Sequence, residues 1–383
     1  MKTKIFLFVC VGLLLAISQQ GCTSTKALEE VGLTHLDSLC MSPTPEVPRI
    51  SEGDFVKLDS GKILTVYGKF RGQHDFAQAS LMARMSMDNG STWGDEKILI
   101  TPDAHLNVMS VSLLRLSSGK IALFYAIKDA VDDCYPVMRI STDNGESWSE
   151  PTPCIPSQAG YHVLNNSRVI QLKNGRILLP VARHEVKPHK QDKRKFDTFQ
   201  EDGTIFCMYS DDEGATWMKG ECVPSPDIEN LTKQEPGVVQ LQDNSILLYV
   251  RTKLGYQYFS KSFDNGITWS LLEQGTLQSP NAPALIIRDP YTDALVAVWN
   301  ESSDARTPLT IAVSFDEAKT WTHKRILKDA PLWYCYPAIE IPSPNILLIS
   351  YCFGPKETTW GLGGMGIDKY RYKYINELSG ENE

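Results

Sequence analysis

The stretch Ser210–Trp217 reads SDDEGATW, and the chain contains four near-copies of it. The other copies are SMDNGSTW from Ser86, STDNGESW from Ser141, SFDNGITW from Ser262 and SFDEAKTW from Ser314. Every copy begins with Ser, carries Asp two residues later and Trp five residues after the Asp. Repeats spaced by about 50 residues indicate one supersecondary unit that is used several times.

Each copy follows a run of alternating apolar residues, such as TIFCMYS before the Asp of the third copy, which predicts a strand. The Asp-x-Gly step predicts a tight turn, and the Trp starts the return strand. A second strand type, written GKILTVYGKF from Gly61 and NILLISYC from Asn345, occurs six times, each time after another strand. Six four-stranded antiparallel units predict an all-β, six-bladed β-propeller with five Asp turns. The sixth unit lacks an Asp turn, and the final GMGIDKYRYKY is expected to return to it as a strand.

The bulk composition is that of a globular protein. The 383 residues have a net charge of −8 and a pI near 5.5, which argues against a nucleic-acid partner. We expect one propeller domain over residues 40–383, working as a monomer.

The N-terminus has the pattern of an export signal. Lys2 and Lys4 precede an apolar run from Ile5 to Ile17, which is too short for a transmembrane helix. Gly21-Cys22 after this run resembles a bacterial lipoprotein processing site, although Gln19 and Gln20 depart from it and leave plain secretion open. We therefore expect a signal peptide over residues 1–21, lipidation of Cys22 and a tether over residues 22–39. The protein would be exported and held at a membrane, periplasmic or at the cell surface, by its lipid alone.

Two cysteine pairs lie almost symmetrically about Asp turns. Cys134 with Cys154, and Cys207 with Cys222, could form disulfides across hairpins in an exported protein. The alternative is that they are small buried apolar side chains.

Strand alternation predicts which residues share a face. Starts of first strands and loops between second and third strands fall on the face opposite the Asp turns. These positions hold many arginines and carboxylates, one tyrosine and several other polar residues. Among them are Arg49, Glu52, Arg71, Asp75, Ser110, Lys128, Asn165, Arg168, Glu235, Arg251, Asn281, Arg306 and Tyr336. Several guanidinium groups around one funnel predict a site for a carboxylate.

The same segments resemble the sialidase superfamily, over essentially the whole chain after the signal. The five turns resemble its Asp boxes, and QEPGVVQLQDNSILLYVRT resembles its segment with a Glu and an Arg sixteen residues apart, here Glu235 and Arg251. VPRISEGDFVKL, RGQHD, RTPLTIAVSFDEAKTW and CYPAIEI resemble the segments that carry the first arginine, the acid/base Asp, the third arginine and the tyrosine.

The resemblance implies a retaining exo-glycosidase that removes a terminal α-linked sialic acid, or a related ulosonic acid, from glycans. Tyr336 would be the nucleophile, Glu235 its base and Asp75 the general acid/base. Arg49, Arg251 and Arg306 would hold the sugar carboxylate, and Arg71, Asn165 and Arg168 are further candidates at the rim. No metal or other cofactor is expected.

Two departures keep other readings open. Ser51 follows Arg49-Ile50 where the family has Pro, and HVLNNSRVIQL holds polar residues at positions where small ones are usual. Hydrolysis of another acidic sugar, such as a uronic acid, and sugar binding without catalysis therefore remain alternatives.

Overall fold

The computed structural model describes residues 32–59, 61–103, 105–155, 160–192 and 195–372. These residues form an all-β protein whose only described helix, α1, has four residues (Lys356–Thr359). No helix in the described ranges has the length and apolarity needed to cross a membrane.

Three four-stranded antiparallel sheets are each built from consecutive strands. They are β2–β5 (Arg49–Lys57, Ile63–Phe70, Ala79–Ser86, Lys97–Ile100), β17–β20 (Gln234–Gln240, Ile246–Arg251, Tyr256–Ser262, Glu273–Gln278) and β21–β24 (Leu285–Arg288, Leu295–Asn300, Leu309–Ser314, Thr322–Lys328). Strands β18, β22 and β23 are buried along their whole length, so the sheets that contain them are covered on both faces.

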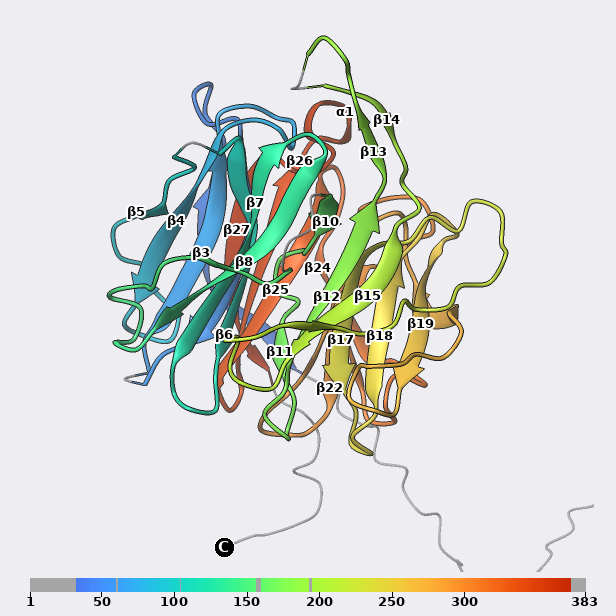
Figure 1. Cartoon of the computed structure of the whole chain (residues 1–383). Helices are drawn as coiled ribbons and strands as arrows, with labels where there is room; N and C mark the ends of the chain where they lie inside the picture. The colour runs from blue at the N-terminus through green and yellow to red at the C-terminus, as the bar shows by residue number, and fades with distance from the viewer. Residues whose placement is uncertain (1–31, 60, 104, 156–159, 193–194, 373–383) are drawn as a thin grey trace, which may run out of the picture.

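A nine-stranded sheet lies between the first two of these sheets in chain order. Its strands are β6–β9 (Asn107–Arg115, Ile121–Ala130, Asp133–Ser141, Thr152–Pro153), β10–β12 (Tyr161–Val163, Ile170–Gln171, Ile177–His184), β15 (Thr204–Ser210) and β16 (Met218–Lys219). Among the described residues, the one strand pairing between the two halves of this sheet is the parallel pair of Tyr161 in β10 with Cys134 in β8. A separate hairpin, β13 (Val186–Pro188) with β14 (Phe196–Phe199), projects at the top of Figure 1.

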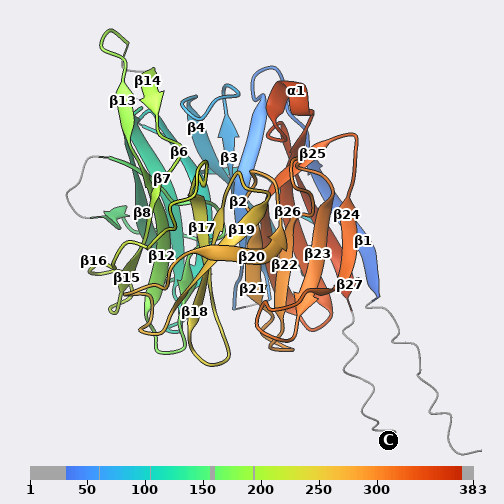
Figure 2. The same ribbon diagram turned by 90° about the vertical axis from the view of Figure 1, so that its right-hand side faces the viewer.

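The last sheet joins the two ends of the chain. Its order is β1 (Leu33–Met41), β27 (Gly364–Tyr372), β26 (Ile346–Gly354) and β25 (Trp333–Ser343). Leu33 pairs with Tyr372 and Met41 with Met365, so the first strand lies beside the last one, as Figure 2 shows. The predicted C-terminal strand is confirmed, but β1 lies within the expected tether, so the boundary at residue 40 is wrong. The expected signal peptide and Cys22 lie outside the described residues.

The sheets pack face to face in a succession that returns to its start. Each of six large core clusters joins apolar residues of two successive sheets, or of the two halves of the nine-stranded sheet. The closing cluster packs Leu348 and Ile367 of the last sheet against Ile63 and Tyr67 of the first. The core therefore lies between sheets rather than within one of them.

The five Asp turns share one hydrogen-bond pattern. In the first, Ser86 Oγ donates to Asp88 Oδ1 at 2.8 Å, and Asp88 accepts from the backbone N–H and the hydroxyl of Thr92 at 2.8 and 2.6 Å. The same bonds recur at Asp143, Asp212, Asp264 and Asp316. The Trp residues that follow pack onto the clusters between sheets, as Trp217 and Trp269 do. The predicted tight turns are therefore confirmed.

The conformation of the Asp turns explains why four of them contain glycine two residues after the Asp. Gly90 has φ +83°, and a Cβ atom there would lie 2.5 Å from Leu348 Cδ2. We expect Gly90→Ala to lower the free energy of unfolding by about 2–4 kcal/mol, because it adds left-handed strain to overpacking. The natural alanine in the fifth turn, Ala318 at φ +64°, provides the control. Ala318→Gly relieves similar strain but loses a buried methyl, so chemical denaturation should place it within about 1 kcal/mol of the wild type.

All seven described cysteines carry free thiols, so neither candidate disulfide is formed. Cys134, Cys154 and Cys207 are buried, and burial raises the pKa of each thiol. They behave as small apolar side chains, whereas Cys222 is exposed.

Candidate active site

A pocket of about 700 Å³ opens at the end of the sheets where α1 and the β13–β14 hairpin lie, the upper end in Figure 1. It is lined by residues at the starts of β2, β6, β17 and β25 and in the loops after β3, β22 and β26. Strands β4, β8, β15, β19 and β23 run from this end to the Asp turns. The turns therefore lie away from the pocket, as predicted.

Four residues that line the pocket have the same unusual backbone conformation, a positive φ at a β-bulge. Glu52, Ser110, Glu235 and Tyr336 have φ of 60°, 59°, 46° and 54°, and each lies at a register shift of a first strand. A β-bulge re-aims the side chain of its strand, and left-handed backbone in non-glycine residues is strained. Strain repeated at equivalent positions of four sheets points to a functional site.

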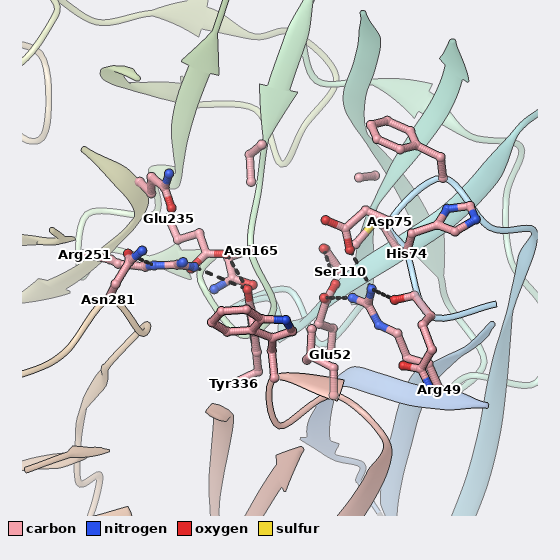
Figure 3. Close-up of a pocket in the computed structure, with 18 of the residues that line it drawn as sticks. Arg49, Glu52, His74, Asp75, Ser110, Asn165, Glu235, Arg251, Asn281 and Tyr336 are labelled. Atoms are coloured by element: carbon pink, nitrogen blue, oxygen red, sulfur yellow. Dashed lines mark hydrogen bonds and ion pairs between the residues drawn. The ribbon is translucent and has the colours of Figure 1, made fainter. Parts of the chain in front are cut away.

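Tyr336 and Glu235 form the central contact of the pocket (Figure 3). Tyr336 Oη donates a hydrogen bond of 2.7 Å to Glu235 Oε1, and Arg251 Nη1 lies 2.5 Å from Glu235 Oε2. Arg251 also reaches Tyr336 Oη at 3.4 Å and Asn281 Oδ1 at 2.7 Å. Residues from β17, β18 and β25 therefore meet in one network.

The electrostatics of this network favour a phenol that donates to an ionised carboxylate. Burial would raise the pKa of Glu235, but the charge and hydrogen bond of Arg251 outweigh it, and the pKa is lowered. Burial, and then the charge of Glu235, raise the pKa of Tyr336 well above its usual range. Glu235 is thus available to accept a proton that Tyr336 does not release by itself.

Arg49 anchors a second network on the other side of Tyr336 in Figure 3. Its guanidinium lies over the ring of Phe70, with Nη1 2.5 Å from Asp75 Oδ1 and Nη2 2.6 Å from Glu52 Oε1. The other oxygen of Glu52 accepts from Ser110 Oγ at 2.6 Å. Arg49 is therefore held by two carboxylates.

The pKa values of these two carboxyl groups are shifted in opposite directions. Burial raises the pKa of Glu52 despite its pairing with Arg49. The Asp75 side chain is 52% exposed at the pocket, and its partial desolvation is outweighed by the charges of Arg49 and then Lys128, which lower its pKa. Asp75 in this structure is an ionised partner of Arg49.

Arg306 reaches the pocket without a carboxylate partner among the described residues. It donates to Trp360 O at 3.0 Å and Asn281 O at 3.2 Å, and its guanidinium lies 5.9 Å from the ring centroid of Tyr336. All three predicted arginines thus line one pocket, but Arg49 and Arg251 are paired with acidic residues in it.

The three rim candidates differ in their outcome. Asn165 lines the pocket, and its Nδ2 atom is buried with no hydrogen-bond partner in the structure. Arg168 is buried elsewhere, donating to Tyr249 Oη at 3.0 Å and Ala284 O at 2.5 Å, so it joins sheets and does not line the pocket. Arg71 is exposed and also lies outside the pocket lining. These two arginines therefore lie outside the pocket in which the other predicted site residues meet.

Lys128 is a site residue to which the sequence analysis assigned no role. It is 2% exposed, and its Nζ donates to the backbone oxygen of Asp75 at 3.0 Å. The same ammonium lies 4.9 Å and 5.2 Å from the ring centroids of Phe76 and Tyr161. The sequence offered one sign of this role, a lysine near the end of the apolar run IALFYAIKDA. A buried lysine needs hydrogen-bond acceptors or aromatic rings around its ammonium group.

Within the described ranges, no three His, Cys, Asp or Glu side chains are grouped so that they could hold a metal ion. The charged groups of the pocket are instead arginines, Lys128 and carboxylates.

The chain belongs to the BNR repeat-like domain family, whose model matches residues 105–347, and thus to the sialidase superfamily. Among curated proteins it is similar to a sialidase of Micromonospora viridifaciens, 26% identical over 289 residues, which cover 67% of this chain and 42% of that protein. A sialidase of Paraclostridium sordellii is 23% identical over 229 residues, covering 54% and 53%. The chain spans about half the length of these relatives.

Solved structures share the fold. The intramolecular trans-sialidase from Ruminococcus gnavus superposes with a TM-score of 0.68 at 15% identity, covering 89% of this chain and 97% of that one. A protein of unknown function from Dyadobacter fermentans gives a TM-score of 0.70 at 17% identity, covering 89% and 100%.

Proposed function

We propose that the protein is a retaining exo-glycosidase that hydrolyses a terminal α-linked sialic acid, or a related ulosonic acid, from a glycan. The observation that carries this proposal is the 2.7 Å hydrogen bond from Tyr336 to Glu235 in a pocket that also contains three arginines. A phenol activated by a carboxylate avoids the repulsion that a carboxylate nucleophile would meet at a sugar whose anomeric carbon bears a carboxylate.

The architecture that we propose is a six-bladed propeller. The two halves of the nine-stranded sheet count as two blades, because a single ladder pair among the described residues joins their strands. With the four other large sheets this makes six, and the succession of core clusters supports a ring. Such a ring presents its loops to one central funnel.

The reaction would proceed in two displacements. Tyr336 Oη attacks the anomeric carbon while its proton passes to Glu235, and Asp75 protonates the leaving oxygen as the glycosidic bond breaks. Water, deprotonated by Asp75, then releases the sugar from Tyr336, and Glu235 returns the phenolic proton. Two inversions at one carbon retain the configuration.

Asp75 must be protonated to act first as an acid, and its pairing with Arg49 opposes this. A sugar carboxylate bound by Arg49 would take the place of Asp75 in that ion pair. The loss of this pair raises the pKa of Asp75, so substrate binding itself would prepare the acid.

Lys128 is expected to tune this acid. Its charge lowers the pKa of Asp75, so in Lys128→Met the pKa of Asp75 should rise while the apolar stem is kept. The alkaline limb of the pH profile of kcat, where the enzyme–substrate complex loses its acid proton, should move to higher pH. Lys120→Met, which removes a lysine paired with Glu213 outside the pocket, should leave the profile in place. If the alkaline limb does not move in Lys128→Met, Lys128 does not control the pKa of Asp75.

The test of the proposed function is a panel of α-linked sialosides and uronic-acid glycosides, with the anomer of the first product identified by NMR. Release of the α-anomer of a sialic acid supports the proposal. Release of a uronic acid alone would support the second acidic-sugar reading. Binding of the glycan without turnover would support a sugar-binding protein.

The sequence alone supports our proposal for the location of the protein in the cell. We propose that the protein is exported, lipidated at Cys22 and active as a monomer on glycans. Mass spectrometry of the mature N-terminus tests the lipid, and a mature chain that starts elsewhere, without a diacylglyceryl group, would overturn it.

A further inference from the structure

A row of aromatic side chains leads out of the pocket from the acid candidate Asp75. The ring centroid of Phe76, its neighbour in the chain, lies 5.8 Å from that of Phe196, and Phe196 lies 5.9 Å from Phe199. Phe196 and Phe199 both belong to β14 of the projecting hairpin. Phe196 remains 41% exposed, so the row, here called the aromatic ridge, offers a ring to a ligand.

The ridge is supported from behind. Phe199 stacks on the ring of His184 at 4.9 Å and meets the ring of Tyr161 edge-on at 5.5 Å. Both supporting rings belong to the nine-stranded sheet and are buried. The ridge is therefore fixed to the sheet although its hairpin projects from it.

A second cleft, of about 650 Å³, begins on the other side of Phe199. Phe199 lines both this cleft and the pocket, so the ridge connects them. The cleft is mostly polar, with Asp202, Asp227, Asn230 and Thr232 among its lining residues. Carboxylate, amide and hydroxyl groups bind the hydroxyls of sugars.

The charge of the cleft restricts what it can hold. Glu201, Asp202 and Asp227 line it. Lys253 pairs with Glu201, and Lys233 lies 2.5 Å from Asp202. The described lining therefore has no lysine left over for an anionic ligand, and Asp227 adds a negative charge. Such a surface repels a further anionic sugar and accepts uncharged ones.

We infer that the aromatic ridge and the second cleft bind the uncharged sugars on the leaving-group side of the glycan. The inference rests on the proposed function, in which Asp75 protonates the leaving oxygen. The sugar attached to that oxygen must then lie beside Asp75, where Phe76 begins the ridge. The C–H face of a pyranose packs on the electron-rich face of an aromatic ring, and the following sugar reaches the cleft beyond Phe199.

The kinetic test compares two substrates of the same acidic sugar, sialyllactose and the methyl α-sialoside. Phe196→Ala should lower kcat/KM for sialyllactose about tenfold and leave the methyl sialoside, which has no leaving-group sugar, within about twofold. Phe263→Ala removes the same side chain from a 77% exposed position on an Asp turn, and it should change neither substrate. Equal losses on both substrates, or no loss on sialyllactose, would overturn the inference.

A binding test separates the inference from the proposed function. Lactose, titrated at millimolar concentration and followed by NMR, should bind the wild type and Phe263→Ala but bind Phe196→Ala and Asp227→Ala much more weakly. If lactose binds in this way but no sialoside is hydrolysed, the sugar site stands and the proposed hydrolase fails. If lactose binds all four proteins equally, or none of them, the site does not exist.

Discussion

Glu235→Gln is expected to lower kcat on an acidic-sugar glycoside by about 10²–10⁴-fold and to leave KM nearly unchanged. Glutamine keeps the size of the side chain and can accept the hydrogen bond from Tyr336, so the pocket should keep its shape. It cannot take up the phenolic proton, and the pKa of Tyr336 is already raised by burial. The nucleophile would therefore remain a neutral phenol at the moment of attack.

Two further variants make this prediction specific. Tyr336→Phe should be at least as slow, and the double variant no slower than the worse single one, because residues that act as a unit are not additive. The matched control is Glu96→Gln, since Glu96 accepts a hydrogen bond of 2.5 Å from Tyr67 Oη outside the pocket. It should change kcat by less than about twofold. Additive losses in the double variant would remove Glu235 from the activation of Tyr336.

Arg251→Lys is expected to cost about 2–5 kcal/mol in kcat/KM for the acidic substrate. Arg251 donates through Nε to Asn281 and through Nη1 to Glu235 and Tyr336. An ammonium group cannot reproduce this fork or grip a sugar carboxylate at two points. Part of the loss comes from Glu235, whose pKa would rise once the guanidinium is gone.

The methyl ester of the substrate separates these two contributions. It lacks the anionic carboxylate, so the penalty of Arg251→Lys on the ester should contain only the part that acts through Glu235. The difference between the two penalties measures the carboxylate contact. Arg288→Lys, at an arginine paired with Glu317 outside the pocket, should leave both substrates unaffected. Identical penalties on acid and ester would show that Arg251 does not bind a carboxylate.

The repeats made most of the fold predictable. A Ser, an Asp and a Trp at fixed spacing specify a hairpin through local hydrogen bonds, so the five turns could be read without tertiary information. Strand β1 could not, because its residues are mostly half-buried or exposed and the strand is defined only by its pairing with β27, more than 300 residues away. The parallel contact of Tyr161 with Cys134 is likewise a purely tertiary feature.

The site was predictable where residues sit at strand starts. Alternating strand direction places Glu235, Tyr336, Arg49 and Arg251 on one face, and the pocket contains them all. The same logic failed for Arg168. The residue before it, Ser167, has φ 56°, and the Arg168 side chain is directed to Tyr249, a turn that a strand pattern does not reveal.

The pairing of Arg49 was also hidden in the sequence. The bulge at Glu52 brings its carboxylate onto the arginine three residues earlier, whereas a regular strand would send these two side chains to opposite faces.

The pairing of β1 with β27 fixes how the molecule would stand on a surface. Strand β27 starts near the pocket, since Leu362 lines it, and ends at Tyr372 beside Leu33. Both ends of the described chain therefore leave from the side opposite the pocket mouth. Any attachment made through the chain before Leu33 would orient the mouth away from its own support, toward glycans on a facing cell or in the medium. Under the proposed activity and lipid attachment, the protein would act on glycans that face away from the membrane that holds it.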